Sequence, residues 1–174
     1  NYRKKLWSTE KAGKVMSKLM EYVDIVVANE EDAEKVFGIK AADTDVTTGE
    51  LDLAGYKYVA KELMERFNLE IVTITLRESL SASDNNWSAM LYDGNEYLFS
   101  KKYELHIVDR VGGGDSFGAG LIYSLITGKD NRDALEFAVA ASALKHTIIG
   151  DANHVSVDEV ETLKGGDASG RVQR

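Results

Sequence analysis

Three consecutive glycines followed by an acid form a group that could do chemistry, namely Gly112, Gly113, Gly114 and Asp115. They lie between an apolar segment and an amphipathic stretch, so we predict a turn that leads from a strand into a helix. Glycine lets the backbone approach a ligand closely and adopt positive φ angles. The first amides of a helix have no intrahelical acceptor and, together with the helix dipole, attract anions. The run therefore predicts a site for a phosphate-like anion.

Asp115 needs an explanation, because a carboxylate beside an anion site is repelled unless it has a chemical task. Taking the proton of an attacking hydroxyl group is such a task, and aspartate is the base in other phosphoryl-transfer enzymes. A simpler alternative is a flexible turn in which Asp115 only caps the next helix. Short glycine motifs often match by chance, so the glycines alone favour this alternative.

The elements that would position this group follow from the hydrophobic pattern. We predict strands over residues 23–28, 70–76, 87–92 and 97–101 and a short one ending near 108, and helices over residues 9–22, 29–37, 50–67, 116–127, 131–149 and 157–163. This alternation predicts an α/β fold with a largely parallel sheet, interrupted by a β-hairpin at residues 93–96. Ligands in such folds bind beyond the carboxyl ends of strands. The loops at Asn29, Thr75 and Gly112 are therefore expected at one edge.

The composition restricts the class of partner. The 174 residues are 44% hydrophobic and 29% charged, as in an ordinary globular protein. The net charge is -8 and there is no long basic run, which argues against nucleic acid and anionic membranes as partners. The chain has no cysteine, which excludes disulfides and thiol catalysis and fits a cytoplasmic protein.

The stretch DRVGGGDSFGAG, residues 109–120, resembles the C-terminal signature of the PfkB family of carbohydrate kinases. That signature reads Asp-Thr-x-Gly-Ala-Gly-Asp followed by small residues, and Arg110 and Gly113 depart from it. The resemblance implies that Asp115 is the catalytic base and that the amides of residues 112–114 stabilise the transferring phosphoryl group. It also implies a monovalent cation such as K⁺ beside the loop, with Asp109 as a ligand.

Three further segments resemble nucleotide-binding parts of the same family. Asn29 and Asp32 match an Asn-x-x-Glu motif that organises Mg²⁺ and the phosphates of ATP, with aspartate in place of glutamate. Thr75 and Arg77 match a Thr-x-Gly nucleotide loop, with arginine in place of glycine, and Ala143 lies on a helix face expected to meet adenine. The alternatives are a plain helix cap with an acidic first turn, a solvated arginine and ordinary helix packing.

The first residues carry the most specific indication of substrate. The run NYRKKLW, residues 1–7, resembles the 2-keto-3-deoxygluconate kinases within the family. There the arginine meets the sugar acid, which implies the same for Arg3, and a matching acid implies that Asp151 contacts sugar hydroxyls. The alternatives are a frayed basic terminus for Arg3 and an ordinary loop acid for Asp151.

Together these resemblances predict that residues 1–174 form the C-terminal part of one ribokinase-like, three-layer α/β/α kinase domain. The N-terminal half with its lid is expected to be a missing partner, so the chain alone should phosphorylate little. The intact protein is expected to be a homo-oligomer that uses ATP and Mg²⁺ to phosphorylate the primary hydroxyl of 2-keto-3-deoxygluconate. The alternatives are a fructokinase, a ribokinase, a nucleoside kinase, or a non-catalytic nucleotide-binding module.

Overall fold

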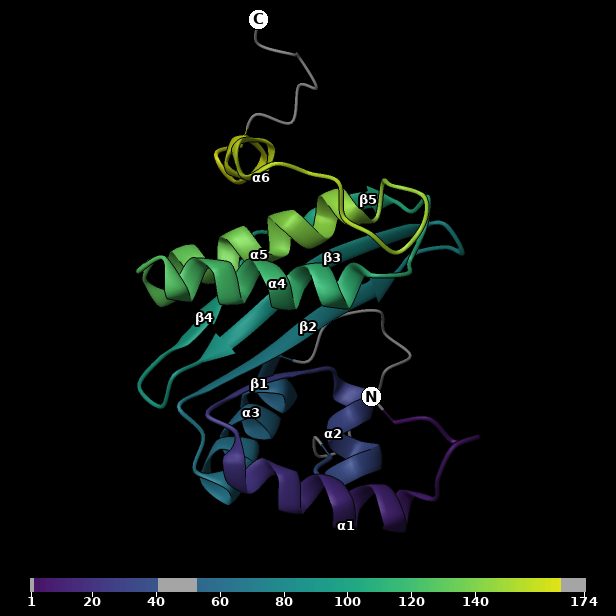
Figure 1. The fold of residues 1–174 in the computed structure, drawn as a ribbon, viewed down its shortest axis with the longest axis vertical. Coiled ribbons are helices and arrows are strands. Elements are labelled where there is room, and N and C mark those ends of the chain that lie inside the picture. Colours follow the sequence, from purple (N-terminus) through teal and green to yellow (C-terminus); the bar gives the residue numbers. More distant parts are fainter. Residues whose placement is uncertain (1, 41–52, 167–174) are drawn as a thin grey trace, which may run out of the picture. The chain divides into compact units, whose positions relative to one another are not determined.

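The computed structural model describes residues 2–40 and 53–166 and divides into two compact units (Figure 1). Unit 1 comprises Asn1–Leu76 and Met90–Leu98, and unit 2 comprises Arg77–Ala89 and Phe99–Arg174. The α/β class that the alternating pattern predicts is confirmed. Within the described ranges, no helix is long and apolar enough to cross a membrane.

Unit 1 holds the first helices of the chain, and their ends follow the capping signals of the sequence. Its elements are α1 (Thr9–Leu19), a 3₁₀ turn (Met20–Tyr22), β1 (Ile25–Ala28), α2 (Glu30–Phe37) and α3 (Leu53–Phe67). Ser8 caps α1 and Asn29 caps α2, each by accepting a backbone N–H with its side-chain oxygen. Gly38 ends α2 in the left-handed conformation that glycine tolerates best.

The sheet has the strand order β1-β2-β3-β4, and β5 pairs with β3. Its later strands are β2 (Ile71–Ser79), β3 (Asp84–Tyr92), β4 (Tyr97–Phe99) and β5 (Tyr103–His106). Strands β1 and β2 are parallel, with Ile25 opposite Ile71, whereas β3 and β5 are antiparallel, with Trp87 opposite Tyr103. The turn between β3 and β4 at residues 93–96 confirms the predicted hairpin.

Strands β2 and β3 are longer than the sequence pattern predicts, because a second hairpin joins them. The amides of Leu80 and Ser81 both donate to the carbonyl of Asp84, at 3.0 Å, and the Ser81 hydroxyl donates to the Asp84 carboxylate. The turn residues 80–83 read Leu-Ser-Ala-Ser and include no glycine, proline or asparagine, so the sequence lacks the dipeptides that mark a tight turn.

Unit 2 contains α4 (Gly113–Ile126), α5 (Asn131–Lys145) and α6 (Val157–Lys164). Helix α4 begins inside the glycine run, three residues before the predicted start, and α5 ends four residues before its predicted end. Helices α4 and α5 pack closely at Gly120, where an added Cβ would lie 3.0 Å from the Cα of Ala138. At Gly118, by contrast, nothing lies within 4 Å of an added Cβ.

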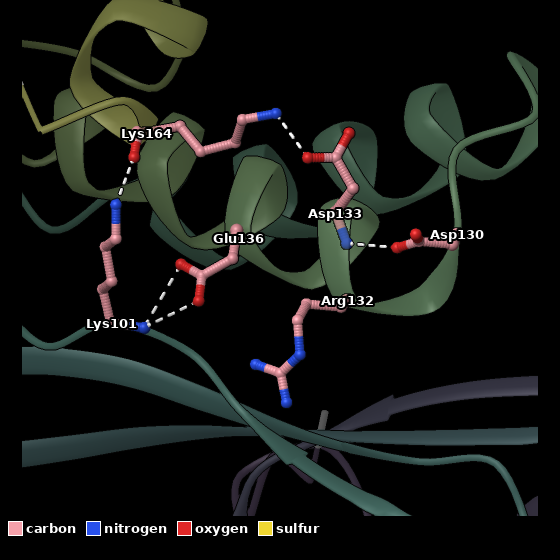
Figure 2. A pocket seen from close by; sticks show the side chains of 6 residues that line it. All are labelled: Lys101, Asp130, Arg132, Asp133, Glu136 and Lys164. Atoms are coloured by element: carbon pink, nitrogen blue, oxygen red, sulfur yellow. Dashed lines mark hydrogen bonds and ion pairs between the residues drawn. The ribbon is translucent and has the colours of Figure 1, made fainter.

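Helix α6 is held on α5 by a cluster of alternating charges, consisting of Lys129, Asp133, Glu161 and Lys164. Both ammonium groups contact both carboxylates, and the two lysine pKa values are raised while those of the acids are lowered. Figure 2 shows Lys164 reaching Asp133 beside a hollow of about 350 Å³. Because these charges already pair with one another, we assign the cluster a structural role.

The substitution Asp133→Asn should lower the free energy of unfolding by about 0.5–1.5 kcal/mol, because it removes one of the two carboxylates that both lysines contact. Hydrogen bonds from Lys129 and Lys164 hold the pKa of Asp133 below its usual value. Its contribution is therefore present above the unfolded pKa and is lost as the pH falls through the folded value. Urea unfolding should show the full difference between wild type and variant at pH 7 and a smaller one at pH 3, which lies below the unfolded pKa.

Candidate functional site

The glycine run forms a tight turn that fits against a second loop of unit 2. Gly112 is the N-cap of α4 and has a φ of 80°, in the left-handed region that favours glycine. A Cβ at this position would lie 2.1 Å from the carbonyl oxygen of Asp151. No residue with a side chain can occupy the position without moving one of the two backbones.

Several amides of the turn are available to an anion. No described residue provides a backbone acceptor for the amides of Gly112 and Gly114. The amide of Gly113 donates to the carbonyl of Arg110 over a long 3.4 Å, so a stronger acceptor could displace that bond. The predicted anion site thus keeps two unengaged amides and one weakly engaged amide.

Two side chains from α5 and its C-terminal end support Gly113 from below. The hydroxyl of Ser142 donates to the carbonyl of Gly113 at 2.8 Å. The ring of His146 lies where a side chain at Gly113 would be, since a Cβ there would be 2.6 Å from its Cε1. His146 Nδ1 donates to the carbonyl of Ser142 at 2.7 Å, and burial lowers the pKa of the imidazole. The ring is therefore a neutral, fixed packing surface for the turn.

Asp109 joins the glycine turn to the loop that contains Asp151. Its Oδ1 accepts from the amide of Val111 at 3.0 Å, and its Oδ2 accepts from the amide of Gly150 at 2.9 Å. These two backbone hydrogen bonds lower the pKa of the carboxyl group. The carboxylate ties two loops that are distant in the sequence and keeps both at the start of α4.

Asp115 lies in the first turn of α4 with its side chain exposed. It is not the N-cap, so the alternative that Asp115 merely caps the helix is wrong. No hydrogen bond or ion pair joins its carboxylate to any other residue in the part of the chain that the structure describes. It borders a cavity of about 340 Å³, together with Asp151 and Asn153, whose apolar wall includes Phe137 and Val160. The carboxylate is thus unpaired among the described residues and borders an open cavity.

Two guanidinium groups add positive charge to this part of unit 2. Arg110 donates to the carbonyl of Ala82 at 2.8 Å, which anchors it to the turn between β2 and β3. Arg110 and Arg77 both contribute to the lowered pKa of His146, so both act electrostatically on the ring beneath Gly113. These two positive charges favour an anion close to this ring.

The structure changes the setting of three predicted nucleotide contacts. Thr75 and Arg77 lie inside β2, which continues to Ser79, so the prediction that they form a loop after the strand is wrong. The reason is the hairpin between β2 and β3, which extends β2 beyond the predicted end of the strand. Ala143 is 1% exposed in the core of unit 2, whereas its neighbour Ala141 borders the cavity with Asp115.

The remaining predicted site residues belong to unit 1. The Asn29 side chain accepts from the amide of Asp32 at 2.8 Å, as the plain-cap alternative predicts. The Asp32 carboxylate also accepts from the amide of Tyr2 at 3.0 Å, which fixes the segment that carries the exposed Arg3. Among the described residues there is no cluster of three or more His, Asp or Glu that could hold a metal ion.

Comparison with known proteins identifies the family. The model of the pfkB family carbohydrate kinases matches residues 1–157. The chain belongs to the PfkB family. The fold agrees with this, since the structure of 2-dehydro-3-deoxygluconokinase from Thermotoga maritima superposes with a TM-score of 0.87 at 49% identity. That match covers 95% of this chain and 48% of the Thermotoga chain.

Two curated relatives carry different enzyme names. A 2-dehydro-3-deoxygalactonokinase of Haloferax volcanii is 34% identical over 97% of this chain and 46% of its own length. An ATP-dependent 6-phosphofructokinase of Thermoanaerobacterium thermosaccharolyticum is 27% identical over 94% of this chain and 44% of its own length. The chain thus spans about half the length of the relatives it matches.

The contact between Gly113 and His146 predicts opposite effects at two adjacent glycines. Gly113→Ala should lower the free energy of unfolding by about 1–3 kcal/mol, because its methyl group overlaps the ring. Gly114→Ala is the matched control, since nothing lies within 4 Å of its added Cβ. It should leave stability unchanged or raise it by about 0.5–1 kcal/mol. Equal urea midpoints for the two variants would contradict the steric role of His146.

Proposed function

We propose that this chain is the catalytic part of an ATP-dependent kinase that phosphorylates the primary hydroxyl group of a 2-keto-3-deoxy sugar acid, foremost 2-keto-3-deoxygluconate. The observation that carries the proposal is the position of Asp115. Its carboxylate has no partner among the described residues, borders a cavity and stands beside amides that have no backbone acceptor. A base next to an anion site is the arrangement that phosphoryl transfer to an alcohol requires.

In the proposed mechanism, Asp115 accepts the proton of the sugar hydroxyl as that oxygen attacks the terminal phosphoryl group. The amides of Gly112, Gly113 and Gly114 donate to the equatorial oxygens of the phosphoryl group, where negative charge is spread in the transition state. Asp151 shares the cavity with Asp115 and would orient the sugar through its hydroxyl groups. The leaving group keeps the bonding electrons of the broken P–O bond.

Nucleotide and metal binding are proposed for residues of both units, each on its own observation. Thr75 and Arg77 sit on β2, and the exposed guanidinium of Arg77 is a donor for ATP phosphates. Mg²⁺ in such enzymes is held by one or two carboxylates together with phosphates and water. Asp32 is the carboxylate we propose, and Asn29 fixes the helix turn on which it lies. The bound ion would neutralise phosphate charge.

The choice of a sugar acid rests on Arg3 and on the names of two relatives. Arg3 is exposed on a segment fixed through Asp32, so its guanidinium can pair with a substrate carboxylate. The Thermotoga and Haloferax relatives are named for closely related 2-keto-3-deoxy sugar acids. Because one relative is a phosphofructokinase, a neutral or phosphorylated sugar is the second candidate for the substrate.

We propose that activity requires the remainder of a full-length kinase. Strand β1 is at the end of the strand order, and its Ile25 and Val27 are 37% and 44% exposed. Such apolar side chains on a strand of an α/β sheet are normally covered by further elements. Assays therefore use the full-length protein that carries this chain. Assembly into homo-oligomers and a cytoplasmic location stay predictions.

Asp115→Asn should lower the rate constant of phosphoryl transfer by about 10²–10⁴-fold, because the amide cannot accept the proton. Affinity for ATP should stay nearly unchanged. Asp130→Asn is the matched control, since Asp130 caps α5 and asparagine caps equally well. Single-turnover transfer and ATP binding, measured separately, check this. An unaffected transfer rate in Asp115→Asn would refute the assignment of the base and favour a non-catalytic nucleotide-binding module.

Arg3→Met should raise the KM for the sugar acid by about 10- to 100-fold, the equivalent of one charge-assisted hydrogen bond. The KM for ATP should not change. Lys4→Met serves as the control, because Lys4 is the neighbouring exposed cation. Steady-state kinetics with 2-keto-3-deoxygluconate, fructose and ribose would show the effect for the acid alone. An equal loss for fructose would assign Arg3 a structural role instead.

A further inference from the structure

Lys145, the last residue of α5, is a charged side chain with 0% exposure. Its ammonium group donates to the carbonyl oxygen of Ile148 at 3.0 Å. An ammonium ion in the protein interior is costly unless an opposite charge and hydrogen bonds compensate it. A negatively charged side chain is therefore expected nearby, and its position indicates what Lys145 does.

The acid on which the charge of Lys145 acts is Asp109, at the start of the glycine turn. Hydrogen bonds from the amides of Val111 and Gly150 are the main causes of its lowered pKa, and the charge of Lys145 adds to them. The two residues are also linked through the backbone, because the amide of Asp109 donates to the carbonyl of His146, which follows Lys145. The lysine thus places a positive charge where the glycine turn and residues 146–150 meet.

This arrangement does not fit the monovalent cation that the family resemblance implies beside Asp109. Both carboxylate oxygens of Asp109 already accept backbone amides, and the carbonyl of Ile148 already accepts the ammonium group. A bound ion would have to replace these donors. It would also stand close to a buried positive charge, and repulsion between like charges is strong where water is excluded.

We propose that the Lys145 ammonium group is a built-in replacement for a monovalent cation, so that the glycine turn keeps its shape without K⁺. Lys145 is then a positioning residue, since it touches the loops and not the reacting atoms. The catalytic consequence rests on the proposed kinase function. The structural consequence, a folded state that takes up no monovalent cation at this place, does not.

The first test compares the full-length wild-type protein in KCl, NH₄Cl, NaCl and tetramethylammonium chloride at equal ionic strength. The kcat for phosphoryl transfer should agree within about twofold across the four salts, because none of the ions has a site to fill. The melting temperature should also be the same in KCl and tetramethylammonium chloride, since an ion bound to the folded state would raise it. Stimulation of about tenfold or more by K⁺ or NH₄⁺, or a melting temperature raised by K⁺, would overturn the proposal.

The second test replaces the charge with an apolar side chain of similar length. Lys145→Met should lower kcat by about 10- to 100-fold, as a small misplacement of catalytic groups does, with little change in the KM for the sugar. The variant should gain a response that wild type lacks, namely partial recovery of kcat and melting temperature in KCl or NH₄Cl. Lys102→Met is the control, because Lys102 is a half-exposed lysine of the same unit.

The outcomes separate this proposal from the proposed function. Absence of transfer by wild type with every sugar tested would refute the kinase assignment, and the melting temperatures would still judge the role of Lys145. Lys145→Met with unchanged kcat and no response to any salt would refute that role. If Lys145→Met does not fold, the salt comparison on wild type decides alone.

Discussion

The close approach of two backbones at Gly112 is the constraint on which the candidate site depends. The carbonyl of Asp151 lies where the Cβ of any other residue would be, and the ring of His146 fills the corresponding space beside Gly113. Two adjacent positions of the turn therefore cannot carry side chains. This brings the start of α4 against the loop that carries Asp151, so that Asp115 and Asp151 border the same cavity.

Asp109 and Asp115 show how the same side chain takes different roles at the two ends of this turn. Asp109 is half-buried, and both of its carboxylate oxygens accept hydrogen bonds from backbone amides. Its charge holds loops together and, with its lowered pKa, it is a poor proton acceptor. Asp115 is exposed and has no partner among the described residues, so its carboxylate can meet a substrate hydroxyl. The environment, and not the residue type, distinguishes the structural acid from the acid that we propose as the base.

Much of this arrangement follows from local rules that act on neighbouring residues. Capping by Ser8 and Asn29, the end of α2 at Gly38 and the strand-to-helix turn at the glycines are all properties of a few adjacent residues. The expectation of an anion site arises in the same way, because it needs only unpaired amides at a helix start. The early start of α4 could not be predicted, since glycine is a poor helix former and its helical state here depends on support from α5.

The features that the sequence does not reveal depend on contacts between distant residues. The extension of β2 to Ser79 comes from the turn at residues 80–83, and it moves Thr75 and Arg77 from a loop into a strand. Lys145 follows a run of small apolar residues and carries no sign of burial, because lysine at a helix end is usually exposed. A compensating acid 36 positions earlier is visible only once the chain is folded.

The two departures from the PfkB signature each have a structural counterpart. Gly113 stands where the family usually has alanine, and His146 occupies the space of the missing methyl group. Arg110 stands where the family usually has a small residue, and its guanidinium is anchored to Ala82. It also reaches the oxygen of Asn85, in the amide orientation that satisfies both polar atoms of that buried side chain.

One principle accounts for both departures from the PfkB signature. His146, Arg110 and Lys145 all bring bulk or positive charge close to the turn. Asp115 stays unpaired among the described residues and borders the cavity. Changes that strengthen the support of an anion site without entering it preserve the chemistry, because the transition state interacts only with the groups that face it. Residues that pack against the turn can therefore vary, provided that the neighbouring residues leave enough space for each new side chain and compensate its charge.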